Sequence, residues 1–515
     1  MQAKHYIIKS FARDGSGYEP YFYFFNYITS EPAKAISVTL LVKIELACVL
    51  LFILTKMKDS FQKIDSQLNK PTKINLTVKT LLNCQVNQMK SELELLLKLA
   101  ERRGISNAEV YRVSSQSQPV FFEGNRLKQL ESSQSVGTAL RIWQNNRPGL
   151  AVAYGKIDPE LLVNKAIALS ELNQPEIIEL APARHAVHDL TGVSMSVENL
   201  IEVGREAIAL LREEYPELVC SAELEFEQES TTLINSQGLY CHYDESGIAY
   251  SLGAELIRQE DFLGIFDGEY SKSGLNIKPI IEQIITRLDW SKRNVDTPQG
   301  QIPVLLTANA ATLLWGNVSS ALNAKRVIEK SSPWSDLQQQ QVVCDKISLS
   351  QQPDLQPYDC PFDDEGMPTR KLELITNGVL NQFYSDRTIA RELNLAPTGN
   401  GFRPGLDSYP SPSLVNLIVA SGKESFAELI TKLDNGIVVD QMLGGGADIS
   451  GDFSVNVDLG YRVENGKITG RIKDTAISGN VYQILKQVVA LGNDSIWNGS
   501  CYTPSLIVEG ISVVG

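Results

Sequence analysis

Three consecutive acidic residues form a compact group of side chains that could do chemistry. A glycine follows them and a proline stands on each side, and this arrangement predicts a tight loop. Such a loop could ligate a hard cation such as Mg²⁺ or Ca²⁺, act as a general acid or base, or lock a turn by accepting backbone N–H bonds. The residues alone leave these roles open. The segment is Pro361–Arg370, and its candidate residues are Asp363, Asp364, Glu365, Gly366 and Arg370, the last as an ion-pair partner.

A second candidate is the glycine run Gly444, Gly445 and Gly446, whose backbone could approach a ligand closely. A phosphate-binding loop is not supported, because no Gly-Lys-Ser or Gly-Lys-Thr follows and no helix is predicted to begin there. Close backbone packing is the expected role. The run could also form a floor on which an extended peptide lies.

Cysteine and histidine usage restricts nucleophilic and metal chemistry. The seven cysteines are odd in number, widely separated and without a Cys-x-x-Cys pair. This excludes a disulfide framework or a zinc ribbon and indicates a reducing, cytoplasmic setting. All four histidines precede residue 243, so a base for Cys501 would have to come from far away in sequence. His185 and His188 lie in a segment predicted to be a loop and are expected to be unrelated surface residues.

Size and charge limit the classes of protein. A chain of 515 residues is long enough for two to four domains of about 150 residues each. Its hydrophobic content of 43% is typical of globular proteins. With 61 acidic and 47 basic residues the net charge is −14, which argues against a nucleic-acid partner, since such a protein needs a basic face.

Residues 1–88 differ in character from the rest. Residues 35–54 are mostly apolar, and a run of about 20 such residues could span a bilayer. Lys43 and Glu45 interrupt this run, and each would cost about 2.5–3.5 kcal/mol at the centre of a membrane. A membrane anchor and a buried helix are alternatives. The favoured interpretation is an extension from a start codon assigned too early, because an organised region begins after Met89.

The organised region begins with an N-terminal domain at residues 89–295, predicted to pack helices on an antiparallel sheet. A first helix precedes a meander of short strands over residues 109–154. Asp158 and Ser196 are placed to cap the next two helices. A second subregion, residues 196–290, continues the sheet and ends in a helix.

A boundary near Asp296–Gly300 precedes a second domain at residues 300–515. A strand and a helix open it, and many short strands separated by turns follow. Such spacing predicts a curled, barrel-like β-domain with decorating helices. The fold class is therefore α+β.

The second domain contains a series of short motifs in a fixed order over about 215 residues. They are Phe362–Gly366, Asn377–Leu380, Thr398–Gly401, Pro410–Asn416, Gly444–Ser454, Glu464–Lys467 and Pro504–Gly515. In these motifs the domain resembles the TldD/PmbA family, once called modulators of DNA gyrase, and residues 89–295 resemble it more loosely. The resemblance implies a fold of the kind described above.

The family has two branches, and the resemblance implies that this chain is in the PmbA, or TldE, branch. TldD-like members carry a zinc motif, HExxxH, in the helix after the first strand of this domain. Trp315, Gly316 and Ser320 stand at the three motif positions here, and none supplies a good zinc ligand. Cys501 falls near the position of a cysteine ligand in zinc-bearing relatives, and a lone thiolate cannot complete a site.

The resemblance also implies a function. PmbA-type members pair with a TldD-type zinc subunit to form a protease for unfolded or extended peptides. We therefore expect a cytoplasmic, metal-free subunit that shapes the cleft while zinc in the partner does the cutting; a homo-oligomer stays open. One alternative is a non-enzymatic regulator related to gyrase, and another is an independent hydrolase acting through Asp363 and Glu365, or through Cys501. Both branches share the acidic loop, so it is expected to serve the scaffold or substrate handling.

Overall fold

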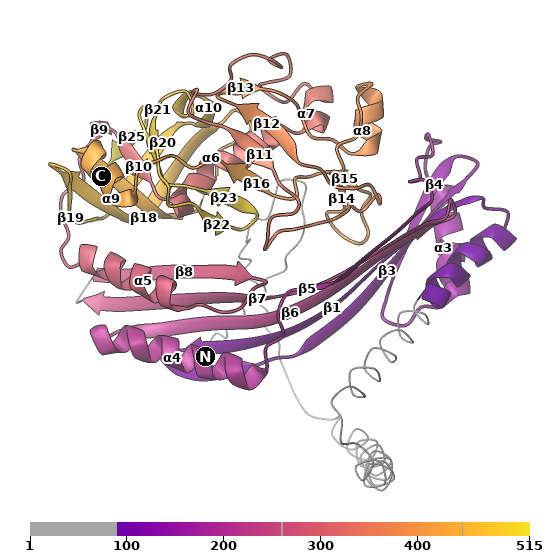
Figure 1. The fold of residues 1–515 in the computed structure, drawn as a ribbon, viewed down its shortest axis with the longest axis horizontal. Helices are drawn as coiled ribbons and strands as arrows, with labels where there is room; N and C mark the ends of the chain where they lie inside the picture. The colour runs from indigo at the N-terminus through magenta and orange to yellow at the C-terminus, as the bar shows by residue number, and fades with distance from the viewer. Residues whose placement is uncertain (1–89, 259–260, 445) are drawn as a thin grey trace, which may run out of the picture. The chain divides into compact units, whose positions relative to one another are not determined.

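The computed structural model of the chain describes residues 90–258, 261–444 and 446–515 (Figure 1). The predicted extension at residues 1–88 and its apolar segment at 35–54 lie outside these ranges. No helix within them is both long and apolar enough to cross a membrane. The described chain begins in a helix at residues 90–102.

An eight-stranded sheet follows, with the strand order β4-β3-β1-β6-β7-β5, in which β2 pairs with β1 and β8 with β7. Neighbouring strands are antiparallel except for β5, which runs parallel to β7. The strands are β1 (Asn107–Glu123), β2 (Arg126–Leu130), β3 (Ser133–Gln144), β4 (Arg147–Tyr154), β5 (Arg184–Thr191), β6 (Val219–Asn235), β7 (Leu239–Arg258) and β8 (Asp261–Ser271).

Several strands are longer than the sequence pattern predicts. The sequence predicts only short strands over residues 109–154, yet β1 pairs with β6 without interruption from Glu109 to Phe122. The polar middle of β1, near Ser115, breaks the apolar alternation but not the hydrogen-bond ladder. Backbone pairing across strands therefore sets strand length here, more than local side-chain pattern.

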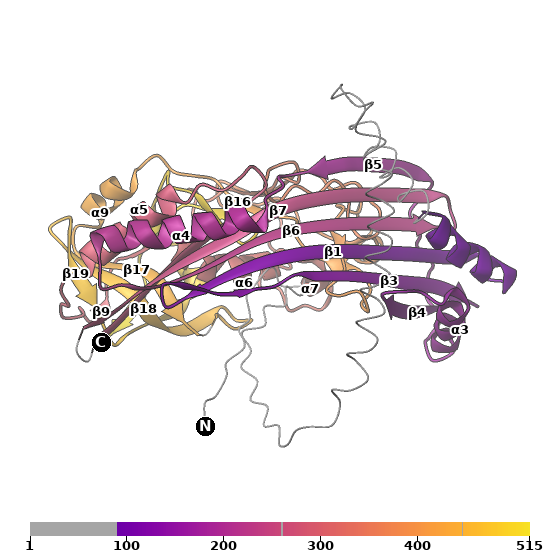
Figure 2. The same ribbon diagram turned by 90° about the horizontal axis from the view of Figure 1, so that it is seen from below.

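Besides the helix at residues 90–102, the described part of this region contains three further helices. They are α3 (Pro159–Ser170), α4 (Val197–Glu214) and α5 (Lys278–Trp290). Asp158 and Ser196 cap α3 and α4 as predicted, each accepting a bond from a backbone N–H in the first turn. Figures 1 and 2 show α4 and α5 on one face of the sheet. Ala222, Leu224 and Phe226 of β6 alternate with glutamates and belong to the apolar core that also includes residues of α4 and α5.

The chain from residue 300 onward is rich in β-structure, with a curled sheet, as predicted. The nine-stranded sheet has the order β21-β24-β10-β17-β18-β20-β25-β9, with β19 on β18; a six-stranded sheet has the order β13-β12-β11-β16-β23-β22, and β14 pairs with β15. The strands are β9 (Gly300–Gln301), β10 (Val304–Leu306), β11 (Leu349–Gln351), β12 (Leu372–Thr376), β13 (Val379–Leu380), β14 (Gly401–Phe402), β15 (Ser411–Pro412), β16 (Leu417–Val419), β17 (Gly436–Leu443), β18 (Asp452–Glu464), β19 (Lys467–Ile472), β20 (Thr475–Asn480), β21 (Val488–Leu491), β22 (Ile496–Asn498), β23 (Cys501–Thr503), β24 (Leu506–Val508) and β25 (Ser512–Val514).

Decorating helices were predicted for this region, and the described residues contain them. They are α6 (Ala308–Ala321), α7 (Ala324–Ile328), α8 (Arg387–Glu392), α9 (Phe426–Leu433) and α10 (Val481–Ile484). The side chain of Thr307 caps α6 by accepting a bond from Ala310 N, and this fixes where α6 begins.

The amide of Gln441 joins the two large sheets. Its Oε1 accepts a hydrogen bond from the Phe266 N–H at 2.9 Å, and its Nε2 donates to the Gly264 carbonyl at 3.2 Å. Both backbone groups belong to β8, whereas Gln441 lies on β17. A side chain thus pairs with the edge of β8 in the way a neighbouring strand would, and a common apolar core continues from α5 to β17 and β18.

Candidate functional site

The acidic triplet lies in a tight loop, as the sequence predicts. The Asp363 N–H donates to the Met367 carbonyl and the Gly366 N–H to the Asp363 carbonyl, both at 2.9 Å. Gly366 has φ +76°, and a Cβ there would come within 2.5 Å of Leu239 Cδ2. Phe362 reaches from this loop into an apolar cluster with Tyr111, Leu239 and other residues of the eight-stranded sheet.

The carboxylate of Asp363 is held entirely by backbone donors. Its Oδ1 accepts from the N–H groups of Glu365, at 3.1 Å, and Met367, at 2.8 Å. Its Oδ2 accepts from the Gly401 N–H at 2.9 Å. The side chain is fully buried, so it ties the start of β14 to the loop and offers no open oxygen to a ligand.

The other two acids are also buried and reach other segments. Asp364 Oδ2 accepts from the Arg403 N–H at 2.7 Å. Glu365 Oε2 accepts from the Arg387 N–H, at the start of α8, at 2.9 Å. A Cβ on Gly401 would lie 2.4 Å from Glu365 Oε2, so glycine is needed where the backbone passes this carboxylate.

Two arginines bring positive charge to this loop. Arg403 Nη2 lies 2.7 Å and Arg141 Nη2 3.1 Å from Glu109 Oε1. All three side chains are less than a tenth exposed. Arg403 also lies over the ring of Tyr111 at 4.9 Å. These contacts connect β1 and β3 of the eight-stranded sheet to the segment that follows β14.

Burial shifts the acid equilibria of this cluster. It raises the pKa of Asp363 to about 7 and that of Asp386, the N-cap of α8, to about 6. Burial and the nearby charges of Asp363 and Asp386 raise the pKa of Glu365 well above its usual range. Near neutral pH this cluster therefore retains protons that free carboxylic acids would have lost.

Arg370 does not form the predicted ion pair with the loop. Its side chain is exposed and makes no ion pair with another described residue, and its carbonyl accepts a bond from Gln351 Nε2 at 3.0 Å. The structure instead places Arg403 and Arg141 beside the acids. Sequence reasoning missed both, together with Glu109, because they come from separate segments with no shared motif.

The three positions that the resemblance aligned with a zinc motif lie on α6. Trp315 is buried, and its Nε1–H donates to Thr503 Oγ1 at 2.7 Å. Gly316 is exposed, and a Cβ there would meet no atom within 4 Å. Ser320 is half-buried.

Cys501 lies on β23, the strand that also contains Thr503. It is half-buried, and burial raises the pKa of its thiol to about 12, so it stays a neutral thiol at ordinary pH. Among residues 90–258, 261–444 and 446–515, no three His, Cys, Asp or Glu side chains form a cluster that could hold a metal ion.

The glycine run follows β17. Gly444 has φ +61°, and a Cβ on Gly444 or Gly446 would meet open space, so neither glycine shows the close packing that we expected. Gly445 lies outside the described residues. The nearby Asp448 carbonyl accepts a bond from Asn317 Nδ2, on α6, at 2.7 Å. The segment after β17 therefore lies against the helix that carries Trp315 and Gly316.

His185, His188 and His242 lie in strands, although a loop was expected at the first two. His185 and His188 are on β5; His185 stacks on Tyr240 with ring centroids 5.0 Å apart, and His188 lies 6.1 Å from the ring of Phe362. The buried His242 contacts Thr232 Oγ1 at 2.8 Å and Asp244 Oδ2 at 3.2 Å. Each ring thus has a neighbour that accounts for its position.

Comparisons with known proteins agree with this fold. The family model described as PmbA/TldA metallopeptidase C-terminal domain matches residues 299–515, and that described as PmbA/TldA metallopeptidase domain 1 matches residues 108–170. The chain is 22% identical to the crystal structure of TldE from Thermococcus kodakarensis, with a TM-score of 0.76, covering 82% of this chain and 99% of that one. At this identity the likeness concerns the fold.

Two curated relatives show similarity over shorter stretches. One is a metalloprotease TldD homolog of Buchnera aphidicola, 35% identical over 134 residues, which are 26% of this chain and 28% of the relative. The other is metalloprotease PmbA of Escherichia coli O157:H7, 29% identical over 216 residues, which are 40% of this chain and 46% of the relative. The matched stretches thus span less than half of either relative. Taken with both family models and the fold, they show that this chain is a member of the PmbA/TldD metallopeptidase family.

Proposed function

We propose that this chain is a PmbA-type, or TldE-type, subunit of a heteromeric protease, and that a TldD-type partner holds the zinc. The observation that carries the proposal is the chemistry of α6, where Trp315, Gly316 and Ser320 occupy the positions that the resemblance aligns with the zinc motif. The family fold is retained around them. The chain then contributes shape and substrate contacts, and the partner performs the cut.

The residues at these positions do not suit zinc. The indole Nε1 of Trp315 carries a hydrogen, has no free lone pair and donates to Thr503. Gly316 has no side chain, and the neutral hydroxyl of Ser320 is a poor ligand. Cys501 could ligate only as a thiolate, and its raised pKa opposes this form. No catalytic step is therefore assigned to a metal in this chain.

The acidic loop serves the scaffold in this proposal. Asp363, Asp364 and Glu365 are each less than a tenth exposed and bond to the backbone of distant segments. A general acid or base needs to reach a substrate atom within about 3 Å, and these carboxylates are occupied inside the protein. These carboxylates hold β14 and α8 against the acidic loop, and Phe362 of the same loop packs into the apolar cluster of the sheet.

The substrate proposed is an unfolded or extended peptide. Gly444 and Gly446 are exposed and bear no side chain, and they follow a strand and lie near α6. An extended peptide can lie against such a backbone and add its own hydrogen bonds to it. This placement supports the glycine run as a peptide floor.

Co-expression with a TldD-type subunit tests the proposal. We expect the chain purified alone to contain no stoichiometric zinc and to leave a denatured protein substrate uncut. The pair should co-purify, contain zinc and cleave the substrate. Stoichiometric zinc in the chain alone, or a partner that is equally assembled and equally active without this chain, would overturn the proposal.

A further inference from the structure

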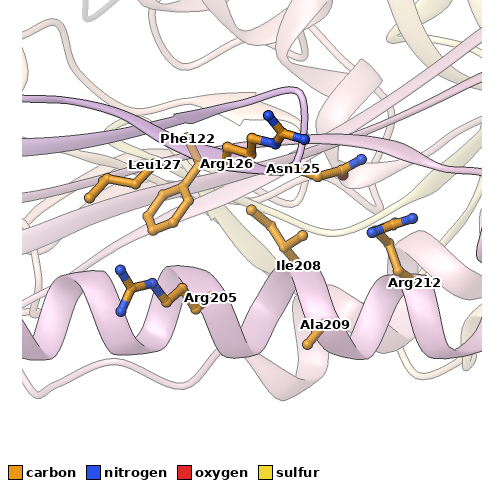
Figure 3. Close-up of a pocket in the computed structure, with 8 residues that line it drawn as sticks. All are labelled: Phe122, Asn125, Arg126, Leu127, Arg205, Ile208, Ala209 and Arg212. Atoms are coloured by element: carbon orange, nitrogen blue, oxygen red, sulfur yellow. The ribbon is translucent and has the colours of Figure 1, made fainter.

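A cavity of about 420 Å³ lies between α4 and the hairpin formed by β1 and β2 (Figure 3). It is within the size range of ligand-binding pockets. Both walls come from the N-terminal part of the described chain, away in sequence from the acidic loop. The residues that line it are Phe122, Asn125, Arg126, Leu127, Arg205, Ile208, Ala209 and Arg212.

The walls of this cavity are fixed by the fold. Gly204 lets Phe122 lie against α4, because a Cβ at that position would come within 2.4 Å of the Phe122 ring. The hairpin turn is anchored by Asn125, whose Oδ1 accepts from the Cys220 N–H at 2.8 Å and whose Nδ2 donates to the Leu218 carbonyl at 3.1 Å. A ligand would therefore meet a preformed surface, which lowers the entropic cost of binding.

Three arginines give the cavity its charge. Arg126, Arg205 and Arg212 are exposed, and none makes an ion pair with another residue that the structure describes. Arg212 donates one bond, from Nη2 to the Pro216 carbonyl at 2.9 Å. None of the glutamates of α4 lines the cavity. In a chain with a net charge of −14, this concentration of guanidinium groups indicates an anionic ligand.

The spacing of the arginines indicates an elongated ligand. Arg205 and Arg212 are seven residues apart on α4, which places their Cα atoms about 10 Å apart along the helix axis. Figure 3 shows Ile208 and Ala209 between them. Two anionic groups spaced along one ligand could each meet one of these arginines. Acidic residues two to four positions apart in an extended peptide are separated by about 7–13 Å, a range that includes this spacing.

We infer that this cavity binds a short acidic peptide segment of a partner protein, in which an apolar residue lies between acidic residues. The acidic side chains meet the guanidinium groups, and the apolar side chain packs against Phe122, Leu127 and Ile208. A nucleic-acid strand suits the site less well, because its long row of phosphates would also meet the negative charge of the rest of the chain. The inference does not depend on the proposed protease role.

Fluorescence anisotropy with a labelled synthetic peptide tests this inference on the full chain. The probe is Glu-Asp-Leu-Phe-Glu-Asp, and the control peptide replaces each acid by its amide. We expect saturable binding of the acidic peptide, at least tenfold weaker binding of the amide peptide, and loss of affinity as NaCl rises, because salt screens exposed charges. Equal binding of both peptides, or no binding of the acidic one, would contradict the inference.

Matched variants locate the binding to this cavity. The double variant Arg205→Glu and Arg212→Glu should weaken binding at least tenfold, and Ala209→Trp should do so with every charge retained, because the ring fills the cavity. Lys165→Glu reverses one positive charge at an exposed position of α3, outside the cavity, and should leave binding unchanged. All four positions are exposed, so circular dichroism should show native folding. Wild-type affinity in the double variant would overturn the inference.

Discussion

Arg403 Nη2 lies 2.7 Å from Glu109 Oε1, and the two residues are 294 positions apart in the chain. Arg141 Nη2 lies 3.1 Å from the same oxygen. This buried contact connects the first strand of the eight-stranded sheet to the segment beside the acidic loop.

Glu109→Gln should destabilise the protein by about 3–5 kcal/mol, because it leaves two buried guanidinium groups without their carboxylate. The measurement is the free energy of urea unfolding. The control is Glu123→Gln, which removes one partner of an ion pair with Lys128 in which both side chains are more than half exposed, and it should change stability by less than about 1 kcal/mol. A similar loss of unfolding free energy in both variants would show that the buried contact contributes no more to stability than the exposed ion pair.

Gly399→Ala should destabilise the protein strongly. Gly399 has φ +77°, and a Cβ there would lie 2.3 Å from the Pro368 carbonyl oxygen, so both conformation and space exclude a side chain. The matched control is Gly104→Ala, which has φ +81° and open space around its Cβ and should cost only about 1 kcal/mol. The difference between the thermal unfolding temperatures of the two variants measures the cost of the steric clash at Gly399. Equal losses of thermal stability in both variants would show that this clash does not contribute.

Asp364→Asn should lower stability by about 1.5–3 kcal/mol, since a charged acceptor of the Arg403 N–H becomes neutral. If the loop belongs to the scaffold, peptide cleavage per mole of assembled heteromer should stay at the wild-type rate. Unfolding curves and cleavage rates are needed on the same preparation. Wild-type stability together with a loss of peptide cleavage would show that the loop takes part in catalysis.

Asp386→Asn should flatten the pH dependence of stability. Burial raises the folded-state pKa of Asp386 to about 6, so its stabilising contribution is complete below about pH 4 and is lost as the pH rises through 6. Asparagine keeps the N-cap bond to Ile389 N but does not titrate. The stability of the variant relative to wild type should therefore increase from pH 4.5 to pH 7. Urea unfolding of both proteins at each of these two pH values measures the change. A difference that does not vary with pH would contradict the shifted pKa.

The sequence by itself determined the features that depend on neighbouring residues. Asp158 and Ser196 cap their helices as predicted because a cap acts within three residues. The Pro and Gly residues around Asp363–Glu365 predict the tight loop for the same reason. The motifs of the second half were sufficient to indicate the family, since their order and spacing are written directly in the chain.

Only the tertiary structure decided which groups satisfy the acids. The sequence suggested Arg370 as a partner, whereas the loop acids accept hydrogen bonds from the backbone of distant segments, among them Gly401, Arg403 and Arg387. The side chains of Arg403 and Arg141 pair with Glu109 beside the loop. The segment that contains His185 and His188 was predicted to be a loop, yet it belongs to β5, because β7 supplies a parallel neighbour. Such contacts join residues far apart in the chain, and no local propensity or periodicity encodes them; long-range packing selects them.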